Sequence, residues 1–366
     1  MGKALIFFIL VGLFLSAGLP FWVDLPVAAL FLVAARKIKT ANLVLVAVSM
    51  ALGLGLVEAT VRLLPTGPQG YYRPHERFWD DQRKLYQPRV DVRMTMPHGD
   101  LIAFDPLVPA SLRQPRQVRF KTDSLGFRNE ADYCGQKIIL AGDSFVVGNG
   151  SDQAQTLPPI LRRNHGLEVY SLACPGDPRD YCQRIKDLLD QVEGPVKVLM
   201  FIFEGNDFKG PGRPLDRPHL YDRLKMAFIA RAHLAYPRYL FNLSRRAQRL
   251  VYRTGREQVE VYQVGGQAVG FLGSYVNNTL FDQPQLLLDE KSCPPALASR
   301  LAAVYFVPTK YRVYFDLLED NRGRILTKPA PAFVAVKRFF EPFGLPVLDL
   351  TPALSHRAKE LLSQGR

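Results

Sequence analysis

The chain has 366 residues, 48% of them hydrophobic and 22% charged, which is enough for one large globular domain with an additional segment. No internal repeat or low-complexity segment is present, which excludes solenoid and repeat architectures. The formal net charge of +13 indicates acidic partners. Nucleic acid is a poor candidate, because the chain has no recognised nucleic-acid-binding motif and the large domain is expected to be exported.

Residues 1–64 are predicted to form a membrane anchor. Two apolar stretches, 4–35 and 41–61, contain only two acidic residues, Asp24 and Glu58, and each stretch is long enough to enter a bilayer. A second apolar stretch after a basic loop favours a permanent anchor over a cleaved signal peptide.

Two or three membrane spans are compatible with the anchor, and we favour three, near residues 4–20, 23–36 and 41–63. The basic loop from Arg36 to Lys39 is expected to face the cytoplasm under the positive-inside rule. The following span then delivers everything after residue 64 to the opposite side, whichever number of spans is present.

Residues 65–135 are predicted to form a linker and an irregular, β-rich collar, with strand-like pieces at 90–94 and 117–121. Gly126 is expected to turn the chain. Arg128 is expected to tie the collar to the main domain through hydrogen bonds, and contact with substrate is its alternative role.

From Lys137 onward, strand-like and helix-like runs alternate, which predicts right-handed βαβ units and an α/β fold with a mainly parallel sheet. The expected elements are strands at 137–141, 167–172 and 196–203, and helices at 156–164 and 179–191.

The alternation stops near Gly205 for about 90 residues, far beyond the usual loop of about 4–6 residues, so an insertion is predicted at about 209–300. It contains an amphipathic helical stretch at 220–252 and a predicted hairpin around Gly265-Gly266. We interpret the insertion as a lid or substrate-binding element, with packing alone as the alternative. Its basic residues form either a solvated helical face or a surface for anionic headgroups or an acidic polysaccharide.

The alternating pattern returns near the C-terminus, with a strand at 302–307, a helix to about 319, a helix at 333–340 and a strand at 345–350. Thr351-Pro352 is expected to start a final helix, with Thr351 as its N-cap.

Polar residues follow three of the predicted strands: Gly142-Asp143-Ser144, Gly176, and Gly205-Asn206-Asp207. A serine at the carboxyl end of a buried strand lies where open α/β sheets build their sites, so Ser144 is the first candidate nucleophile. Val146 excludes the Gly-x-Ser-x-Gly elbow of α/β-hydrolases. If the three strands are parallel and adjacent, the Ser144 and Gly176 N–H groups and the Asn206 amide surround one oxyanion position.

These residues resemble blocks I, II and III of the SGNH (GDSL-like) hydrolase superfamily, although block III lacks the residue between glycine and asparagine. The resemblance covers roughly residues 86–352 and is closest to membrane-anchored bacterial members. Those members often carry an Asn/Asp-Ser-Leu-Gly-Phe-Arg motif, here 123–128, and a Pro-x-Lys-x-x-Val-Tyr motif, here 308–314. It implies a three-layer α/β/α domain at 136–366 with a mainly parallel five-stranded sheet.

The resemblance also implies a catalytic base, which the family takes from a C-terminal Asp-x-x-His that this sequence lacks. Three explanations remain open: the given chain is truncated, the protein is a natural pseudoenzyme, or Asp349 and His356 substitute as acid and base. The other histidines belong to the collar, to a helix end or to the insertion: His75, His98, His165, His219 and His233.

The resemblance implies a serine esterase or O-acetyltransferase in the bacterial inner membrane, with its large domain on the periplasmic side. Its substrate would be the acyl groups of a cell-envelope polysaccharide or glycolipid. Its partners would be the bilayer and the acylated glycan, with no cofactor and no metal. The alternatives are a catalytically inactive SGNH-fold protein that binds polysaccharide or a membrane-protein partner, and a lipase-like enzyme.

The four cysteines are Cys134, Cys174, Cys182 and Cys293. In an exported domain an even number permits disulfides, and Cys174 with Cys182 is one candidate pair. Buried free thiols are the alternative.

Overall fold

The computed structural model describes residues 75, 78–80, 83–96, 99, 101, 105, 108–192, 194–209 and 259–364, together with separate positions between 42 and 60. The chain divides into two units, residues 1–74 with 215–252, and residues 75–214 with 253–366. Nearly all described residues belong to the second unit, so the fold below is that of this unit.

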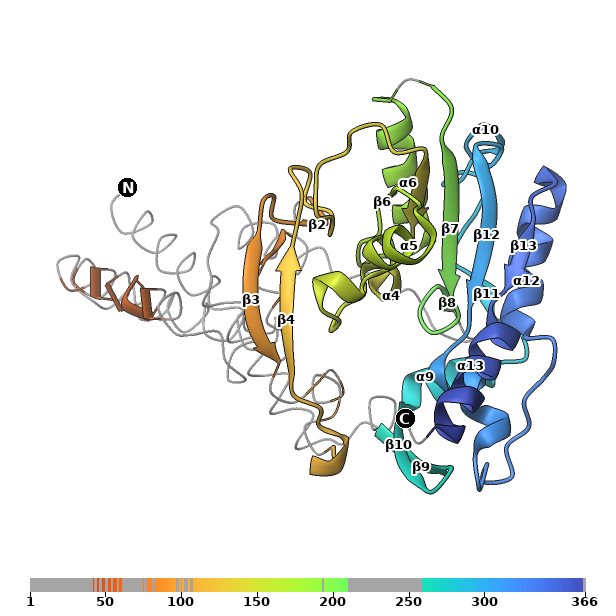
Figure 1. Ribbon diagram of the computed structural model, residues 1–366. Coiled ribbons are helices and arrows are strands. Elements are labelled where there is room, and N and C mark those ends of the chain that lie inside the picture. Colours follow the sequence, from red (N-terminus) through yellow and green to blue (C-terminus); the bar gives the residue numbers. More distant parts are fainter. Residues whose placement is uncertain are drawn as a thin grey trace. The chain divides into compact units, whose positions relative to one another are not determined.

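A five-stranded parallel sheet forms the centre of the second unit, which confirms the predicted α/β class (Figure 1). Its order is β13-β12-β7-β5-β6, so β5 pairs with both β6 and β7. The strands are β5 (Ile138–Ala141), β6 (Val169–Ser171), β7 (Lys197–Phe203), β12 (Leu301–Val307) and β13 (Val347–Asp349). The three central strands are almost entirely apolar, as expected for parallel strands that are covered on both faces.

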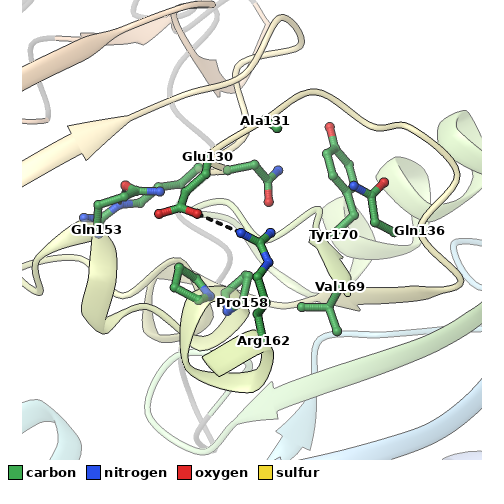
Figure 2. A pocket seen from close by; sticks show the side chains of 11 residues that line it. Glu130, Ala131, Gln136, Gln153, Pro158, Arg162, Val169 and Tyr170 are labelled. Atoms are coloured by element: carbon green, nitrogen blue, oxygen red, sulfur yellow. Dashed lines mark hydrogen bonds and ion pairs between the residues drawn. The ribbon is translucent and has the colours of Figure 1, made fainter. Parts of the chain in front are cut away.

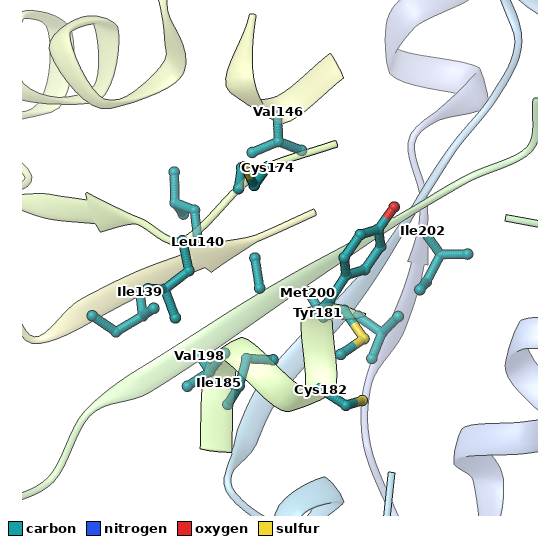
Figure 3. Packing of buried hydrophobic residues seen from close by; sticks show 14 of the residues in the cluster. Ile139, Leu140, Val146, Cys174, Tyr181, Cys182, Ile185, Val198, Met200 and Ile202 are labelled. Carbon is teal, nitrogen blue, oxygen red and sulfur yellow. The ribbon is translucent and has the colours of Figure 1, made fainter. Parts of the chain in front are cut away.

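Three amphipathic helices pack on this sheet: α5 (Leu157–His165), α6 (Pro178–Leu189) and α12 (Pro331–Phe340). All three begin with proline in the first turn, and α6 also has a capping box made by Asp177 and Asp180. Ile185 of α6 packs near Val198 of β7 in the main hydrophobic core (Figure 3).

The collar consists of β1 (Trp79–Asp80), β2 (Leu85–Tyr86), β3 (Asp91–Met96), a 3₁₀ turn at Ala110–Leu112 and β4 (Arg116–Lys121). β3 and β4 confirm the predicted strand-like pieces, and the structure pairs them in antiparallel register. Gly126 has a φ of 97°, and a Cβ there would overlap the Tyr86 carbonyl oxygen, so the turn requires glycine.

Arg128 connects the collar to the segment that follows β5, as predicted. Its guanidinium is buried and donates to the Arg119 carbonyl of β4 at 3.0 Å. It also donates to the Gly148 carbonyl at 2.7 Å and to the Ser151 carbonyl at 2.8 Å. Burial lowers the pKa of Arg128 to about 10.

The described part of the insertion contains β8 (Phe208–Lys209), β9 (Val259–Val264), β10 (Gln267–Leu272), α9 (Gly273–Thr279), β11 (Gln285–Leu286) and α10 (Pro295–Ala298). β9 and β10 form an antiparallel hairpin, which confirms the predicted turn at Gly265-Gly266. Both glycines have positive φ, the conformation that a two-residue hairpin turn needs. The predicted helical stretch at 220–252 lies outside the described residues.

The C-terminal elements are α11 (Lys310–Tyr314), two 3₁₀ turns at Phe315–Leu317 and Glu341–Phe343, and α13 (Thr351–Ser363). The final helix starts where the sequence predicted, but Thr351 is not its N-cap. The cap is Leu350, whose backbone is already helical, and the Thr351 hydroxyl oxygen is buried without a hydrogen-bond partner among the described residues. Instead the Asp349 carboxylate accepts the Thr351 N–H at 2.8 Å.

No helix in the described part of the chain is long and apolar enough to cross a membrane. The predicted spans at 4–20 and 23–36 lie outside the described residues, and only separate positions of the third span are described. Those positions are helical and carry exposed apolar side chains, including Leu45, Leu52 and Leu56.

Candidate active site

Three neighbouring strands end beside one another and carry the candidate site residues. β5 leads into Gly142-Asp143-Ser144, β6 leads toward Gly176, and β7 leads into Gly205-Asn206-Asp207. Because parallel strands present their carboxyl ends at the same edge, the pairing of β5 with β6 and β7 brings Ser144, Gly176 and Asn206 to one edge of the sheet.

Ser144 begins the short helix α4 (Ser144–Val147) and is half-buried. Asp143 caps this helix, since its Oδ1 accepts the Phe145 N–H at 2.8 Å. A Cβ at Gly142 would lie 2.6 Å from a Val146 methyl group, so the tight exit from β5 needs glycine. The first N–H of a helix has no partner within the helix, which leaves the Ser144 amide available at the sheet edge.

The loop that carries Gly176 is held by side chains of α6. Arg184 donates to the carbonyl oxygens of Cys174 and Pro175, each at 3.0 Å. The Pro175 carbonyl and the Gly176 N–H belong to one planar trans peptide and point in opposite directions. Arg184 therefore orients the Gly176 N–H away from α6, and this N–H donates to no other described residue.

Asn206 is exposed and lies close enough to Asp143 for its amide to lower the pKa of that carboxyl group. The turn beneath it is fixed, because the Asn278 side-chain amide of α9 donates to the Gly205 carbonyl. A Cβ at Gly205 would overlap the Phe203 ring, so this turn also requires glycine.

Two carboxyl groups are buried beneath the site, Asp143 (1% exposed) and Asp207 (0% exposed). Burial raises the pKa of Asp143 to about 6. Burial and the nearby Asp143 charge raise the pKa of Asp207 well above its ordinary value. Neither carboxyl group forms an ion pair with a described cation, and Asp143 Oδ2 is buried without a hydrogen-bond partner among the described residues.

An aromatic wall, formed by Phe145, Phe203 and Tyr275, adjoins Ser144. The Phe145 and Phe203 ring centroids lie 3.9 Å apart, and Tyr275 of α9 meets Phe203 edge-on at 5.3 Å. Phe145 is 47% exposed. The edge of the sheet thus offers an accessible apolar surface directly beside the candidate nucleophile.

The candidate acid and base, Asp349 and His356, have other partners. Asp349 ends β13, three strand positions from β5, which at about 4.8 Å per strand is on the order of 14 Å. His356 is 75% exposed on α13, and its Nε2 lies 3.3 Å from Glu360 Oε1. Ser144, Gly176 and Asn206 thus lie at one edge of the sheet, and the contacts of Asp349 and His356 among the described residues are with Thr351 and Glu360.

No histidine among the described residues supplies the missing base. His75 is buried in the collar, where it stacks on Phe120 at 5.5 Å, and His165 is exposed at the end of α5. His98, His219 and His233 lie outside the described residues. Within that same described set, no group of three His, Cys, Asp or Glu side chains is arranged to hold a metal ion.

A small cavity lies away from this site, beside α5 and β6 (Figure 2). Its volume is about 20 Å³, enough for one water molecule. Arg162 and Glu130 form an ion pair of 3.0 Å across it. None of its lining residues is Ser144, Gly176 or Asn206, so the cavity is not part of the candidate active site.

The candidate Cys174–Cys182 disulfide is not formed, and all four cysteines are free thiols, which is the alternative that the sequence left open. Cys182 instead lies beside Cys293, and the neighbouring Cys293 thiol, followed by burial, raises the pKa of the Cys182 thiol. Burial raises the pKa of Cys174 to about 12, which makes that thiol unreactive.

The sequence did not reveal two residues of the site, Tyr181 and Tyr275. Tyr181 lies on the buried face of α6, and its sequence pattern is that of an ordinary core residue. Its position one turn after the capping residue Asp177 nevertheless places it beneath the Gly176 loop. Tyr275 reaches the site from the insertion, 131 positions after Ser144 in sequence numbering, and no local pattern indicates that contact.

Comparison of the chain with protein-family models found no match, and comparison with curated proteins found none either.

Proposed function

We propose that the protein is a membrane-anchored SGNH-type serine esterase or O-acetyltransferase that acts on acyl groups of cell-envelope polysaccharide or glycolipid. The observation that carries this proposal is the meeting of Ser144 with the Gly176 N–H and the Asn206 amide at the ends of three adjacent parallel strands. A fold without acyl-transfer chemistry has no need of that combination of groups.

The sheet order supports the three-layer α/β/α arrangement of this class. Across the sheet, the connection from β5 to β6 runs in one direction. The connections from β6 to β7 and from β12 to β13 run in the opposite direction. Because such crossovers are right-handed, the first connection covers one face of the sheet and the later ones cover the opposite face.

In the proposed reaction the Ser144 hydroxyl attacks the carbonyl carbon of an acyl ester, and the tetrahedral oxyanion accepts hydrogen bonds from the Ser144 and Gly176 N–H groups and from Asn206. Loss of one such donor typically raises the barrier by about 3–4 kcal/mol. A general base takes the serine proton. Collapse of the intermediate breaks the bond to the carrier oxygen, which leaves as an alcohol with the proton from the base, and the acyl group then passes from Ser144 to water or to a sugar hydroxyl.

One feature favours envelope glycans over phospholipids as substrates. The aromatic wall is small and open, which suits a short acyl group on a polar carrier. The exposed leucines between positions 42 and 60, together with the apolar stretches of the sequence, support an anchor in the bilayer. An anchored enzyme of this kind works on material that passes along the membrane surface.

The test is hydrolysis by the purified full chain of acetylated sugars, of long-chain acyl esters and of phospholipid. We expect turnover of the acetyl esters and a fall of about 1,000-fold or more in Ser144→Ala. Ser355→Ala is the matched control, since this serine lies on α13 and donates to the Val313 carbonyl. Equal rates of hydrolysis by wild type and Ser144→Ala would contradict the proposal. A preference for phospholipid would change the proposed substrate from a glycan to a lipid.

A second candidate function is a non-catalytic SGNH-fold protein that binds polysaccharide or a membrane-protein partner. It is favoured by one observation, that no histidine among the described residues contacts Ser144. Binding of acetylated polysaccharide without turnover, equal in wild type and Ser144→Ala, would support this candidate over the enzyme.

A further inference from the structure

The Tyr181 hydroxyl connects the two loops that carry the oxyanion donors. Its oxygen lies 3.2 Å from the Gly176 carbonyl oxygen and 2.9 Å from Asp207 Oδ1. Asp207 directly follows Asn206, and its other oxygen accepts the Phe203 N–H at 2.7 Å. Tyr181 and Asp207 are 1% and 0% exposed, so this chain of contacts is sealed from solvent.

The two contacts of Tyr181 need two protons, and a phenol supplies only one. A carbonyl oxygen is always an acceptor, and an ionised carboxylate is an acceptor as well. If Asp207 were ionised, either the Gly176 carbonyl or the carboxylate would lack a proton from the tyrosine. If Asp207 is protonated, its O–H donates to the Tyr181 oxygen, the tyrosine O–H donates to the Gly176 carbonyl, and both distances are explained.

The charges around Asp207 favour the same state. Asp143 approaches from the loop after β5, and Asp177 from the start of α6, and both raise the pKa of Asp207 further after burial has done so. Arg184 of α6 lowers the pKa of Tyr181, but it donates its hydrogen bonds to the Cys174 and Pro175 carbonyls and not to Asp207. No described cation neutralises an ionised Asp207.

We propose that Asp207 is protonated in the folded protein and that, through Tyr181, it holds the Gly176 carbonyl, so that both residues position the oxyanion donors Gly176 and Asn206. The role of these two residues in catalysis rests on the proposed function. The proton on Asp207 and the hydrogen-bonded link between the two loops belong to the fold and do not depend on that function. Tyr181 and Asp207 touch no reacting atom and are positioning residues.

Replacement of Asp207 by asparagine distinguishes a protonated from an ionised side chain. An asparagine amide donates from Nδ2 where a protonated carboxyl donates its O–H, and its carbonyl oxygen still accepts the Phe203 N–H. Asp207→Asn should therefore behave like wild type, whereas Tyr181→Phe removes the hydroxyl from the centre of the link.

Tyr170→Phe provides a matched control. Tyr170 is also 1% exposed, and its hydroxyl donates to a buried carboxylate, Asp123 Oδ2, at 2.7 Å. That contact belongs to β6 and the collar and touches neither oxyanion loop. Any loss of stability from removing a buried tyrosine hydroxyl is therefore common to both phenylalanine variants.

The experiment measures hydrogen–deuterium exchange of segments 172–177 and 203–209, together with kcat and KM for an acetyl ester, in the full-length variants at pH 7. We expect Tyr181→Phe to reduce protection of both segments by about tenfold and to lower kcat by about 10- to 100-fold with little change in KM. Asp207→Asn and Tyr170→Phe should stay within about threefold of wild type in kcat and retain protection in both segments.

Three results would overturn the proposal. If Asp207→Asn reduced protection and kcat as much as Tyr181→Phe does, Asp207 would be ionised in the folded protein. Tyr181→Phe with exchange like that of Tyr170→Phe would mean no link between the loops. Loosened loops with unchanged kcat would remove the positioning role. If the wild type lacks esterase activity, the proposed function fails separately, and the exchange of the three variants alone supports or overturns the protonated link.

Discussion

Two buried acids at the end of β7, Glu204 and Asp207, lie three residues apart and are accommodated in opposite ways. Glu204 faces β12, where Arg312 approaches it at 2.7 Å and Thr309 donates its N–H at 3.0 Å. Asp207 faces β5, where it meets only an N–H, a phenol and the acidic Asp143. One acid is neutralised by a cation, and the other has no cation among the described residues.

This difference separates a structural edge of the sheet from a reactive one. On the β12 side, Arg312 also donates to the Thr279 and Thr327 carbonyls, which joins the insertion to the C-terminal segment. On the β5 side, Asp143 and Asp207 lie buried beneath Ser144 without a partner cation among the described residues, and the Ser144 amide and hydroxyl remain available. Buried groups with perturbed pKa values that line an accessible edge are typical of functional sites, whereas a buried ion pair with all its hydrogen bonds fixes the fold.

The largest effect is expected on the neutralised side. Arg312→Met leaves Glu204 as an unpaired buried charge and should lower the free energy of unfolding by about 3–5 kcal/mol. The double variant Glu204→Gln/Arg312→Met removes both charges and should recover a large part of that loss. Urea denaturation measures both variants, and a cost below about 1 kcal/mol for the single variant would show that the pair does not stabilise the fold.

A pH-dependent effect is expected on the reactive side. Because the folded-state pKa of Asp143 is raised to about 6 from 3.8, the folded protein keeps a proton that the unfolded chain has released between those values. Stability from this group is thus complete at lower pH and is lost as pH rises from about 4 to 6, by at most about 3 kcal/mol. Asp143→Asn should remove this part of the loss of stability with rising pH. The asparagine side-chain oxygen still accepts the hydrogen bond that caps α4.

Asp91→Asn is the control of opposite sign for the pH experiment. The exposed Asp91 carboxylate accepts hydrogen bonds from Arg119, which lower its pKa, so its contribution is present at higher pH and is lost as pH falls. Parallel denaturation curves at about pH 2, pH 4 and pH 6 would distinguish the two acids, because the Asp91 contribution is lost below about pH 4 and the Asp143 contribution above it. An Asp143→Asn variant with the same pH dependence as wild type would contradict a raised pKa for Asp143.

The smallest effect on stability is expected at the aromatic wall. Phe145→Ala removes a half-exposed ring and should change the free energy of unfolding by less than about 1 kcal/mol, whereas KM for an acetyl ester should rise about tenfold. Phe306→Ala, which empties a fully buried position on β12, should instead cost about 3–5 kcal/mol. Comparable stability losses in the two variants would show that Phe145 serves the core and not the site.

The elements of the sheet were predictable because they depend on local patterns. Apolar runs bounded by glycine identified β5 and β7, and the Gly265-Gly266 pair identified the hairpin, since each of these signals acts over a few residues. Arg128 was also predicted to tie the collar to the main domain, and its guanidinium donates to the Arg119 carbonyl of the collar and to the Gly148 carbonyl after β5.

The distribution of charge in the site was not predictable in this way. Glu204 and Asp207 belong to the same short run, but the cation that selects Glu204 is Arg312, 108 positions away. The predicted Thr351 cap was wrong by one position, because the helix begins at Thr351 itself and Leu350 occupies the cap position. The cysteine pairing depended on packing as well, since Cys182 on α6 meets Cys293 from the insertion.

The measurement that tests the central claim most directly is reaction of the folded full chain with a fluorophosphonate, followed by identification of the modified peptide. An activated serine reacts much faster than an ordinary one. The account predicts modification at Ser144, its loss in Ser144→Ala, and its retention in Ser355→Ala. A folded wild-type protein that remains unmodified, or that is modified at another serine, would contradict a catalytic role for this edge of the sheet.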